Sequence, residues 1–228
     1  MLDDILYFRA DDGDESWASS SSLWRSDGTI AGTEEVFDPS PSEADRIVTI
    51  GAAAGRIYFT TISGEVWVSD GTSDGSERLV SGGLVGFDGF GACRGQTYFF
   101  GPTPTGPAIY ATDGTPEGTA PIIGAAPDTP VVEVGGHCVL IGTPVGGDGR
   151  TQLLALESTA GTDPTLQTLT RTSGSMLGRV GGRVVFVGAL DSTVGVEPWV
   201  SDGTIDGTEL LFDICPQSCS SSPRAFGE

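Results

Sequence analysis

The stretch "VWVSDGTSDGS" at residues 66–76 contains the motif that decides the fold, because the chain repeats it. "SDGT" occurs again at 26–29 and 201–204, and the variant "TDGT" occurs at 112–115. Asp and Thr side chains accept hydrogen bonds from nearby backbone N–H groups, and Gly takes a positive φ at no steric cost, so the motif predicts a tight hairpin turn. We interpret it as a structural turn, with binding of calcium or another ligand as the alternative. The acidic residues of the four copies are Asp27, Asp70, Asp113 and Asp202.

The spacing of these acids indicates five repeats. The intervals between them are 43, 43 and 89 residues, so one further copy is expected near the middle of the last interval. There, "LLALESTAGTDPT" at 153–165 carries Glu157 in place of Asp, and its turn is expected to be irregular. Five units of about 45 residues then account for nearly the whole chain, which we predict to be one domain over residues 1–228.

Each unit carries four short stretches that suit β-strands. The β-branched or aromatic run is expected to be the second strand of a unit, the stretch that ends in the turn motif the third, and an apolar stretch such as "LQTL" at 166–169 the fourth. A further stretch, such as "SMLGRVGG" at 175–182, precedes the next run and is expected to be the first strand of the next unit. Four strands joined by short turns predict a small antiparallel sheet for each unit. The β-branched or aromatic runs lie at 4–8, 55–59, 95–100, 136–141 and 182–187.

Stacking of these sheets predicts the architecture. One four-stranded sheet of this size cannot bury both of its faces, whereas neighbours arranged around an axis bury them for one another. We therefore expect an all-β, monomeric, five-bladed β-propeller of four-stranded antiparallel blades. The chain begins at the second strand of a unit, and the segment near 222–228 resembles a first strand. This C-terminal strand is expected to pair with the N-terminal one and close the ring.

Two copies of the motif carry a resemblance to a known family. "EVWVSDGTSDGS" at 65–76 and "EPWVSDGTIDGT" at 197–208 both place Glu before the Trp. With these residues the chain resembles the bacterial repeat family named for "ELWxxDGTxxGT", and "DICPQSCSSSP" at 213–223 is similar to the Ser-rich linker of that family. The turn also resembles the Asp-box of sialidase propellers, which is a structural hairpin. The resemblance implies a β-propeller on a secreted or surface protein, and it assigns no activity.

The charge of the chain excludes several kinds of partner. There are 31 acidic and 11 basic residues, which give a net charge of −20. Such a surface repels phosphate backbones and anionic bilayers, so nucleic acid is not an expected partner. The sequence has no apolar run of 18 residues, so no membrane insertion is expected. Its Gly-rich stretches separate strands and do not open a helix, so no nucleotide site is expected; we expect no cofactor, with calcium as the alternative.

The four cysteines indicate whether the protein works in an oxidising or a reducing compartment. Cys215 and Cys219 lie four residues apart in a Pro- and Ser-rich loop, where we predict a local disulfide, with free thiols as the alternative. A disulfide implies an oxidising environment. The sequence does not decide whether Cys93 and Cys138 pair. Residues 1–8 lack a charged and then apolar leader. We predict a secreted or cell-surface protein whose signal peptide was removed, with an intracellular protein as the alternative.

The loops between second and third strands are the candidate binding elements. They share one face of the predicted ring with the links between blades, and the strand-to-turn interval that contains them varies from 12 to 20 residues. Loops that vary on a rigid scaffold are where binding usually occurs. The loop at 11–22 contains Asp12 and Asp14, which are calcium-ligand candidates or part of a solvated acidic loop. Trp17 in this loop is either an exposed platform for a sugar ring or folded back over its own loop.

Further polar residues complete this predicted variable-loop face. Asp148 and Arg150 lie in the loop of the fourth unit, and Asp191 lies in that of the fifth. Paired carboxylates could perform glycoside hydrolysis, but no acid stands out from the repeat background. We therefore expect a noncatalytic, extracytoplasmic module that binds a protein or a glycan through this face. A glycan-cleaving enzyme of the five-bladed propeller type and a purely structural spacer are the alternatives.

Overall fold

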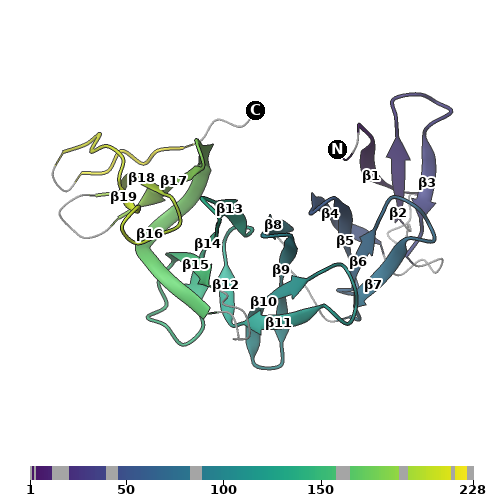
Figure 1. The fold of residues 1–228 in the computed structure, drawn as a ribbon, viewed down its shortest axis with the longest axis horizontal. Coiled ribbons are helices and arrows are strands. Elements are labelled where there is room, and N and C mark those ends of the chain that lie inside the picture. Colours follow the sequence, from purple (N-terminus) through teal and green to yellow (C-terminus); the bar gives the residue numbers. More distant parts are fainter. Residues whose placement is uncertain are drawn as a thin grey trace. The chain divides into compact units, whose positions relative to one another are not determined.

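The computed structural model describes residues 2, 4–11, 21–39, 46–82, 89–157, 165–189, 195–216 and 219–224. Every regular element in these ranges is a β-strand, which confirms the all-β class (Figure 1). The strands are β1 (Leu6–Asp11), β2 (Ser21–Ser26), β3 (Glu34–Phe37), β4 (Ile47–Ala53), β5 (Arg56–Thr61), β6 (Val66–Ser69), β7 (Ser76–Val80), β8 (Gly91–Cys93), β9 (Gln96–Thr103), β10 (Gly106–Thr112), β11 (Ala120–Ile123), β12 (Ala125–Pro127), β13 (Val132–Val134), β14 (His137–Pro144), β15 (Gln152–Glu157), β16 (Thr165–Val180), β17 (Arg183–Gly188), β18 (Glu197–Ser201) and β19 (Glu209–Leu210).

The chain forms two compact units. The first comprises Met1–Gly91, Gly95–Pro104 and Tyr110–Ala120, and the second comprises Ala92–Arg94, Thr105–Ile109 and Pro121–Glu228. The strands form a three-stranded sheet β1-β2-β3, two four-stranded sheets β4-β5-β6-β7 and β8-β9-β10-β11, and an eight-stranded sheet. All pairings with a described register are antiparallel, as predicted. The assignment of residues 1–228 to one domain stays a prediction.

In the first unit, two consecutive sheets share an apolar core. Leu23 and Val36 from β2 and β3 pack with Ile47, Ile57 and Phe59 from β4 and β5, and all five are buried. Phe37, at the end of β3, meets the Trp67 ring at 5.1 Å between centroids. Neither sheet buries this face alone, so packing against the next repeat supplies the burial that the sequence predicts.

In the second unit, the expectation of separate strands at 166–169 and 175–182 is wrong. Residues 166–169 and 175–180 belong to the single strand β16, whose first part pairs with β15 and whose second part pairs with β17. The link between them, residues 170–174, contains no proline, and it is short. Two other links between repeats, 38–46 and 124–131, contain proline, which removes a ladder donor, and the third, 81–90, is longer and contains four glycines. The eight-stranded sheet is therefore two repeats that share one strand.

The first repeat has three strands among the described residues, not four. Leu2 and Ile5 exchange backbone hydrogen bonds at 2.9 and 3.0 Å, and β1 then pairs with β2. Residues 222–224 of the expected closing strand form no strand, and residues 225–228 lie outside the described part of the chain. Closure of a ring by this segment therefore stays a prediction.

Candidate functional site

The repeated turn is built by one hydrogen-bond network. In the second repeat, Asp70 Oδ1 accepts hydrogen bonds from the Thr72 backbone N–H at 2.9 Å and the Thr72 hydroxyl at 2.7 Å. The Thr72 hydroxyl oxygen accepts the Gly75 N–H at 3.0 Å, and the Ser69 hydroxyl oxygen accepts the Gly71 N–H at 3.0 Å. The same contacts recur in the turns of Asp27, Asp113 and Asp202.

These contacts explain the electrostatics of the turn. The hydrogen bond from the Thr72 hydroxyl, followed by that from its backbone N–H, holds the pKa of Asp70 below its ordinary value. The pKa values of the other three turn acids are lowered by the corresponding Thr residues. Within the described residues, no group of three or more His, Cys, Asp or Glu side chains is placed to hold a metal ion. The network supports the interpretation of these turns as structural.

The turn glycine is also a contact point between consecutive repeats of one unit. A Cβ at Gly71 would collide with the Tyr7 hydroxyl, and a Cβ at Gly203 would lie 2.5 Å from the His137 Cβ. A Cβ at Gly28 would meet nothing within 4 Å among the described residues. Gly71 and Gly203 are correspondingly buried, whereas Gly28 is exposed. This contact could not be predicted from the sequence, because the residue that approaches the turn differs from repeat to repeat.

Two candidates from the variable-loop face, Asp148 and Arg150, lie together in the structure. Asp148 Oδ1 accepts hydrogen bonds from the Arg150 N–H at 3.1 Å and from Gln152 Nε2 at 3.4 Å. The Arg150 Nε lies 3.9 Å from Asp148 Oδ2, and 69% of the Arg150 side chain is exposed. The neighbouring Thr151 hydroxyl donates to Asp128 Oδ2 at 3.4 Å, so this loop lies against the link before β13. Asp148 thus holds the loop, while Arg150 is available to a partner.

Asp12, Asp14, Trp17 and Asp191 lie outside the described residues, and their roles stay predictions. The turn of the fourth repeat, residues 158–164 after Glu157, also lies outside them.

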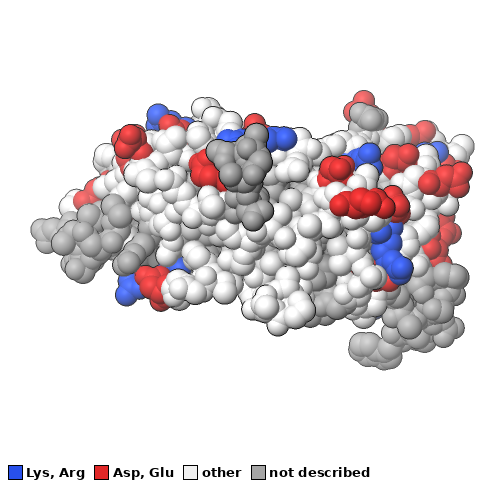
Figure 2. All heavy atoms as spheres, turned by 60° about the horizontal axis from the view of Figure 1, so that its bottom comes forward, with Lys and Arg blue, Asp and Glu red and all other residues white. Residues whose placement is uncertain are grey.

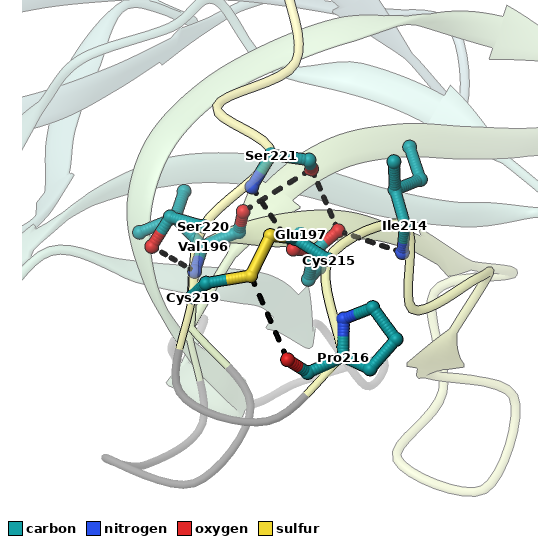
Figure 3. The surroundings of a disulfide bond; sticks show 8 residues. All are labelled: Val196, Glu197, Ile214, Cys215, Pro216, Cys219, Ser220 and Ser221. Atoms are coloured by element: carbon teal, nitrogen blue, oxygen red, sulfur yellow. Dashed lines mark hydrogen bonds between the residues drawn. A yellow bond between two sulfur atoms is a disulfide. The ribbon is translucent and has the colours of Figure 1, made fainter.

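Glu197, at the start of β18, is a buried acid with several hydrogen-bond partners. Its side chain is buried, and Oε2 accepts the Ile214 N–H at 3.1 Å and the Ser221 hydroxyl at 2.6 Å. Oε1 accepts the Ser221 N–H at 3.0 Å (Figure 3). Burial by itself raises the pKa of Glu197, but hydrogen bonds from Ser221, Ile214 and Cys215 outweigh it and hold the pKa below its ordinary value. A buried carboxylate thus anchors the C-terminal segment.

The same repeat position carries a polar side chain with hydrogen-bond partners in two other repeats. This position lies two residues before the aromatic residue of the turn motif, or before Leu154 in the fourth repeat. Glu65 accepts a hydrogen bond from Trp67 Nε1 at 3.0 Å and pairs with Arg78 at 2.6 Å. Gln152 donates to Asp148 and accepts the Thr168 hydroxyl at 2.5 Å. The repeat "ExW" in two units was the sequence signal for this position, although its partners could not be predicted.

The four described cysteines form two disulfides. The predicted bond between Cys215 and Cys219 is present, with Cα atoms 5.5 Å apart. The second bond joins Cys93 of β8 to Cys138 of β14, with Cα atoms 5.7 Å apart, and links consecutive repeats. Beside it, the Arg94 N–H donates to Glu133 Oε2 at 2.8 Å. Two disulfides are compatible with a secreted or cell-surface location.

One small cavity lies in the first unit. Its volume is about 160 Å³, and it is lined by Leu2, Tyr7, Ile50, Gly51, Ala52 and Ile57. Small-molecule sites commonly measure about 300–1,000 Å³. This cavity is smaller, and its lining contains no charged side chain. No helix in the described ranges has the length and hydropathy to cross a membrane.

Comparisons with known proteins bear on the fold. No protein-family model matches the sequence, and no curated protein sequence matches it. The solved structure of TolB from Acinetobacter baumannii is similar over 92% of this chain, with a TM-score of 0.53 and 15% identity. The matched region spans 52% of the TolB chain, about half of its length. A nidogen/laminin complex is similar over 90% of this chain and 74% of the other, with a TM-score of 0.41 and 15% identity. The likeness to TolB supports a β-propeller-like all-β fold and nothing further.

Proposed function

We propose that this chain is a noncatalytic, extracytoplasmic binding or display module, which recognises a protein or a glycan through its variable-loop face. In this proposal the five repeats are the blades of a monomeric propeller, closed by a C-terminal strand from residues 222–228. The motifs that resemble the ELWxxDGT repeat family and the two disulfides support an extracytoplasmic location.

The observation that carries the proposal is a contrast between the two ends of the repeat. At the turn, Asp and Thr of four repeats form the same contacts, so these residues serve the fold. At the opposite end of the same strands, Glu65, Gln152 and Glu197 hold three different sets of partners. A scaffold that keeps one end constant and varies the other is suited to recognition by its variable end.

The charge of the surface narrows the partners. On the face drawn in Figure 2, uncharged residues cover most of the surface, and acidic side chains cover more of it than basic ones. Neutral glycans and basic protein surfaces fit such a surface, whereas nucleic acids and anionic bilayers do not. The exposed guanidinium of Arg150 adds a donor group that suits hydroxyl or carboxylate acceptors.

A glycan array tests the proposal. The wild-type protein should bind a defined set of glycans, and Trp17→Ala or Arg150→Ala should reduce that signal about tenfold or more, as expected for loss of a central contact. Glu117→Ala, an exposed change within the turn motif of the third repeat, is the matched control and should leave binding unchanged. Binding that Glu117→Ala abolishes while both loop variants retain it would refute the assignment of the face. Silence on the array, and no binding to immobilised basic proteins, would favour a structural spacer.

A further inference from the structure

The two disulfides differ in their access to solvent. Cys93 and Cys138 are 1% and 2% exposed, so their bond lies within the protein. Cys219 is exposed and Cys215 is half-buried, so their bond lies at the surface. Thiol–disulfide exchange requires a thiolate to reach a disulfide sulfur. A reductant in solution therefore reaches the Cys215–Cys219 bond first.

The surface disulfide lies, in sequence, between two residues that donate hydrogen bonds to the same carboxylate. Ile214, just before Cys215, donates its N–H to Glu197, and Ser221, two residues after Cys219, donates its N–H and hydroxyl (Figure 3). The disulfide shortens the path between these donors. It thereby holds both of them in position for one acceptor and lowers the entropy lost when they bind.

The two residues before Glu197 also contact the C-terminal segment. The Val196 N–H donates to the Ser220 hydroxyl at 2.8 Å, and the Val196 carbonyl accepts the Ser221 N–H at 3.0 Å. A Cβ at Gly195 would collide with the Cys219 carbonyl, so the two segments approach closely. We name residues 214–216 and 219–222 the clasp, because they contact Glu197 and the adjacent Val196.

We propose that the Cys215–Cys219 bond is a redox latch, whose reduction by a dithiol opens the clasp and exposes the Glu197 carboxylate on the variable-loop face. One thiolate of the dithiol attacks a cystine sulfur, forms a mixed disulfide and releases the other cysteine as a thiolate. The second thiol of the reagent then closes its own disulfide and releases the second cysteine. Two electrons pass from the dithiol to the cystine, and protons from water convert the cysteine thiolates to thiols.

The size of the effect follows from the short loop that the disulfide closes. The cysteines are four residues apart, for which the chain-entropy model predicts that reduction raises the opening equilibrium about twentyfold to thirtyfold. Opening removes the hydrogen bonds that Ile214, Cys215 and Ser221 donate to Glu197, so the carboxylate becomes available to a cation or a donor group of a partner. The inference concerns the clasp alone and does not depend on which ligand the module binds.

Hydrogen exchange with differential alkylation tests the latch. With increasing dithiothreitol, Cys215 and Cys219 should become alkylated first, while Cys93 and Cys138 remain protected. At that dithiothreitol concentration, exchange protection at the Ile214 and Ser221 amides should fall about twentyfold to thirtyfold. Protection along β14 should not change. Equal reduction of both disulfides, or unchanged protection at Ser221 after confirmed reduction, would overturn the proposal.

Variants separate the latch from its acceptor. Cys215→Ser/Cys219→Ser should show the lowered protection without reductant and no further response to it. Glu197→Gln should lower protection with the disulfide intact, because an amide group replaces an acceptor oxygen. Glu65→Gln changes the equivalent position of the second repeat, which contacts Trp67 and Arg78, and should leave the clasp amides unaffected. A clasp that opens equally in Glu65→Gln would show general destabilisation and would refute the latch.

Discussion

The turn glycines allow a graded test of how repeats pack. Gly28, Gly71 and Gly203 have φ values of 90°, 93° and 94° in turns with the same hydrogen bonds. Alanine therefore introduces the same backbone strain at each, about 1–2 kcal/mol, partly offset by about 0.4–1 kcal/mol from the less flexible unfolded chain. The three sites differ only in what the new Cβ meets. The comparison thus isolates the packing contribution.

The expected order is Gly28→Ala, then Gly71→Ala, then Gly203→Ala. The first should destabilise by about 1 kcal/mol, because its Cβ meets no described atom. At Gly71 the colliding group is the tip of Tyr7, which can turn aside, so the added loss should stay below about 1 kcal/mol. At Gly203 the colliding atom is the His137 Cβ, which cannot move without its backbone, and overpacking should add about 1–3 kcal/mol.

Urea unfolding of each variant, followed by tryptophan fluorescence, measures these differences. A double-mutant cycle supplies the control. His137→Gly removes the colliding Cβ, so Gly203→Ala should cost about 1–3 kcal/mol less in that background. Equal destabilisation by Gly28→Ala and Gly203→Ala, or a cycle without coupling, would refute the contact between the turn and the neighbouring repeat.

Two further predictions concern acid and the buried disulfide. The turn acids Asp70 and Asp202 have lowered pKa values in the folded state, so their contribution to stability is present above the ordinary Asp pKa and is lost as pH falls through the folded pKa. The urea concentration at the unfolding midpoint should therefore decrease as the pH is lowered below about 4. An Asp70→Asn/Asp202→Asn variant should show a smaller decrease over the same pH range; the same decrease as in the wild type would contradict the hydrogen bonds of these turns. Cys93→Ser/Cys138→Ser opens a loop of 45 residues and should lower the free energy of unfolding by up to about 4 kcal/mol, with no change if the bond contributes nothing.

The sequence predicted features that arise from local chemistry. The turn at Asp70 depends on residues within five positions, so the motif alone was enough to predict it. The strands β5, β9, β14 and β17 follow runs of β-branched or aromatic residues after turn residues, and each lies where those runs lie. The bond between Cys215 and Cys219 is also local. In each case the partner residues are close in sequence, so composition and spacing carry the information.

Features set by the packing of distant residues could not be predicted in the same way. Cys93 and Cys138 pair because β8 and β14 bring them together, and the spacing alone did not show this. The side chains that approach the turn glycines are Tyr7, Arg56 and His137, which share no chemistry that a motif could record. Two expected strands form the single strand β16, because residues 170–174 contain no proline and form only a short link. A missing proline indicates a continuous strand less clearly than a proline indicates the end of one.

The polar position at the start of the third strand, occupied by Glu65, Gln152 and Glu197, depends both on the local sequence and on contacts with more distant residues. Its place in the repeat is fixed by the turn motif, because Glu65, Gln152 and Glu197 each lie two residues before the inward-facing residue of the third strand. Its partners differ from repeat to repeat: Glu65 contacts Trp67 and Arg78, whereas Glu197 contacts the C-terminal segment. A polar side chain at a partly or fully buried strand end must find hydrogen-bond partners, and groups of the same repeat or of the segment after it supply them. Each loop can therefore change while its neighbours stay fixed, since its anchor is satisfied within its own repeat or the segment that directly follows.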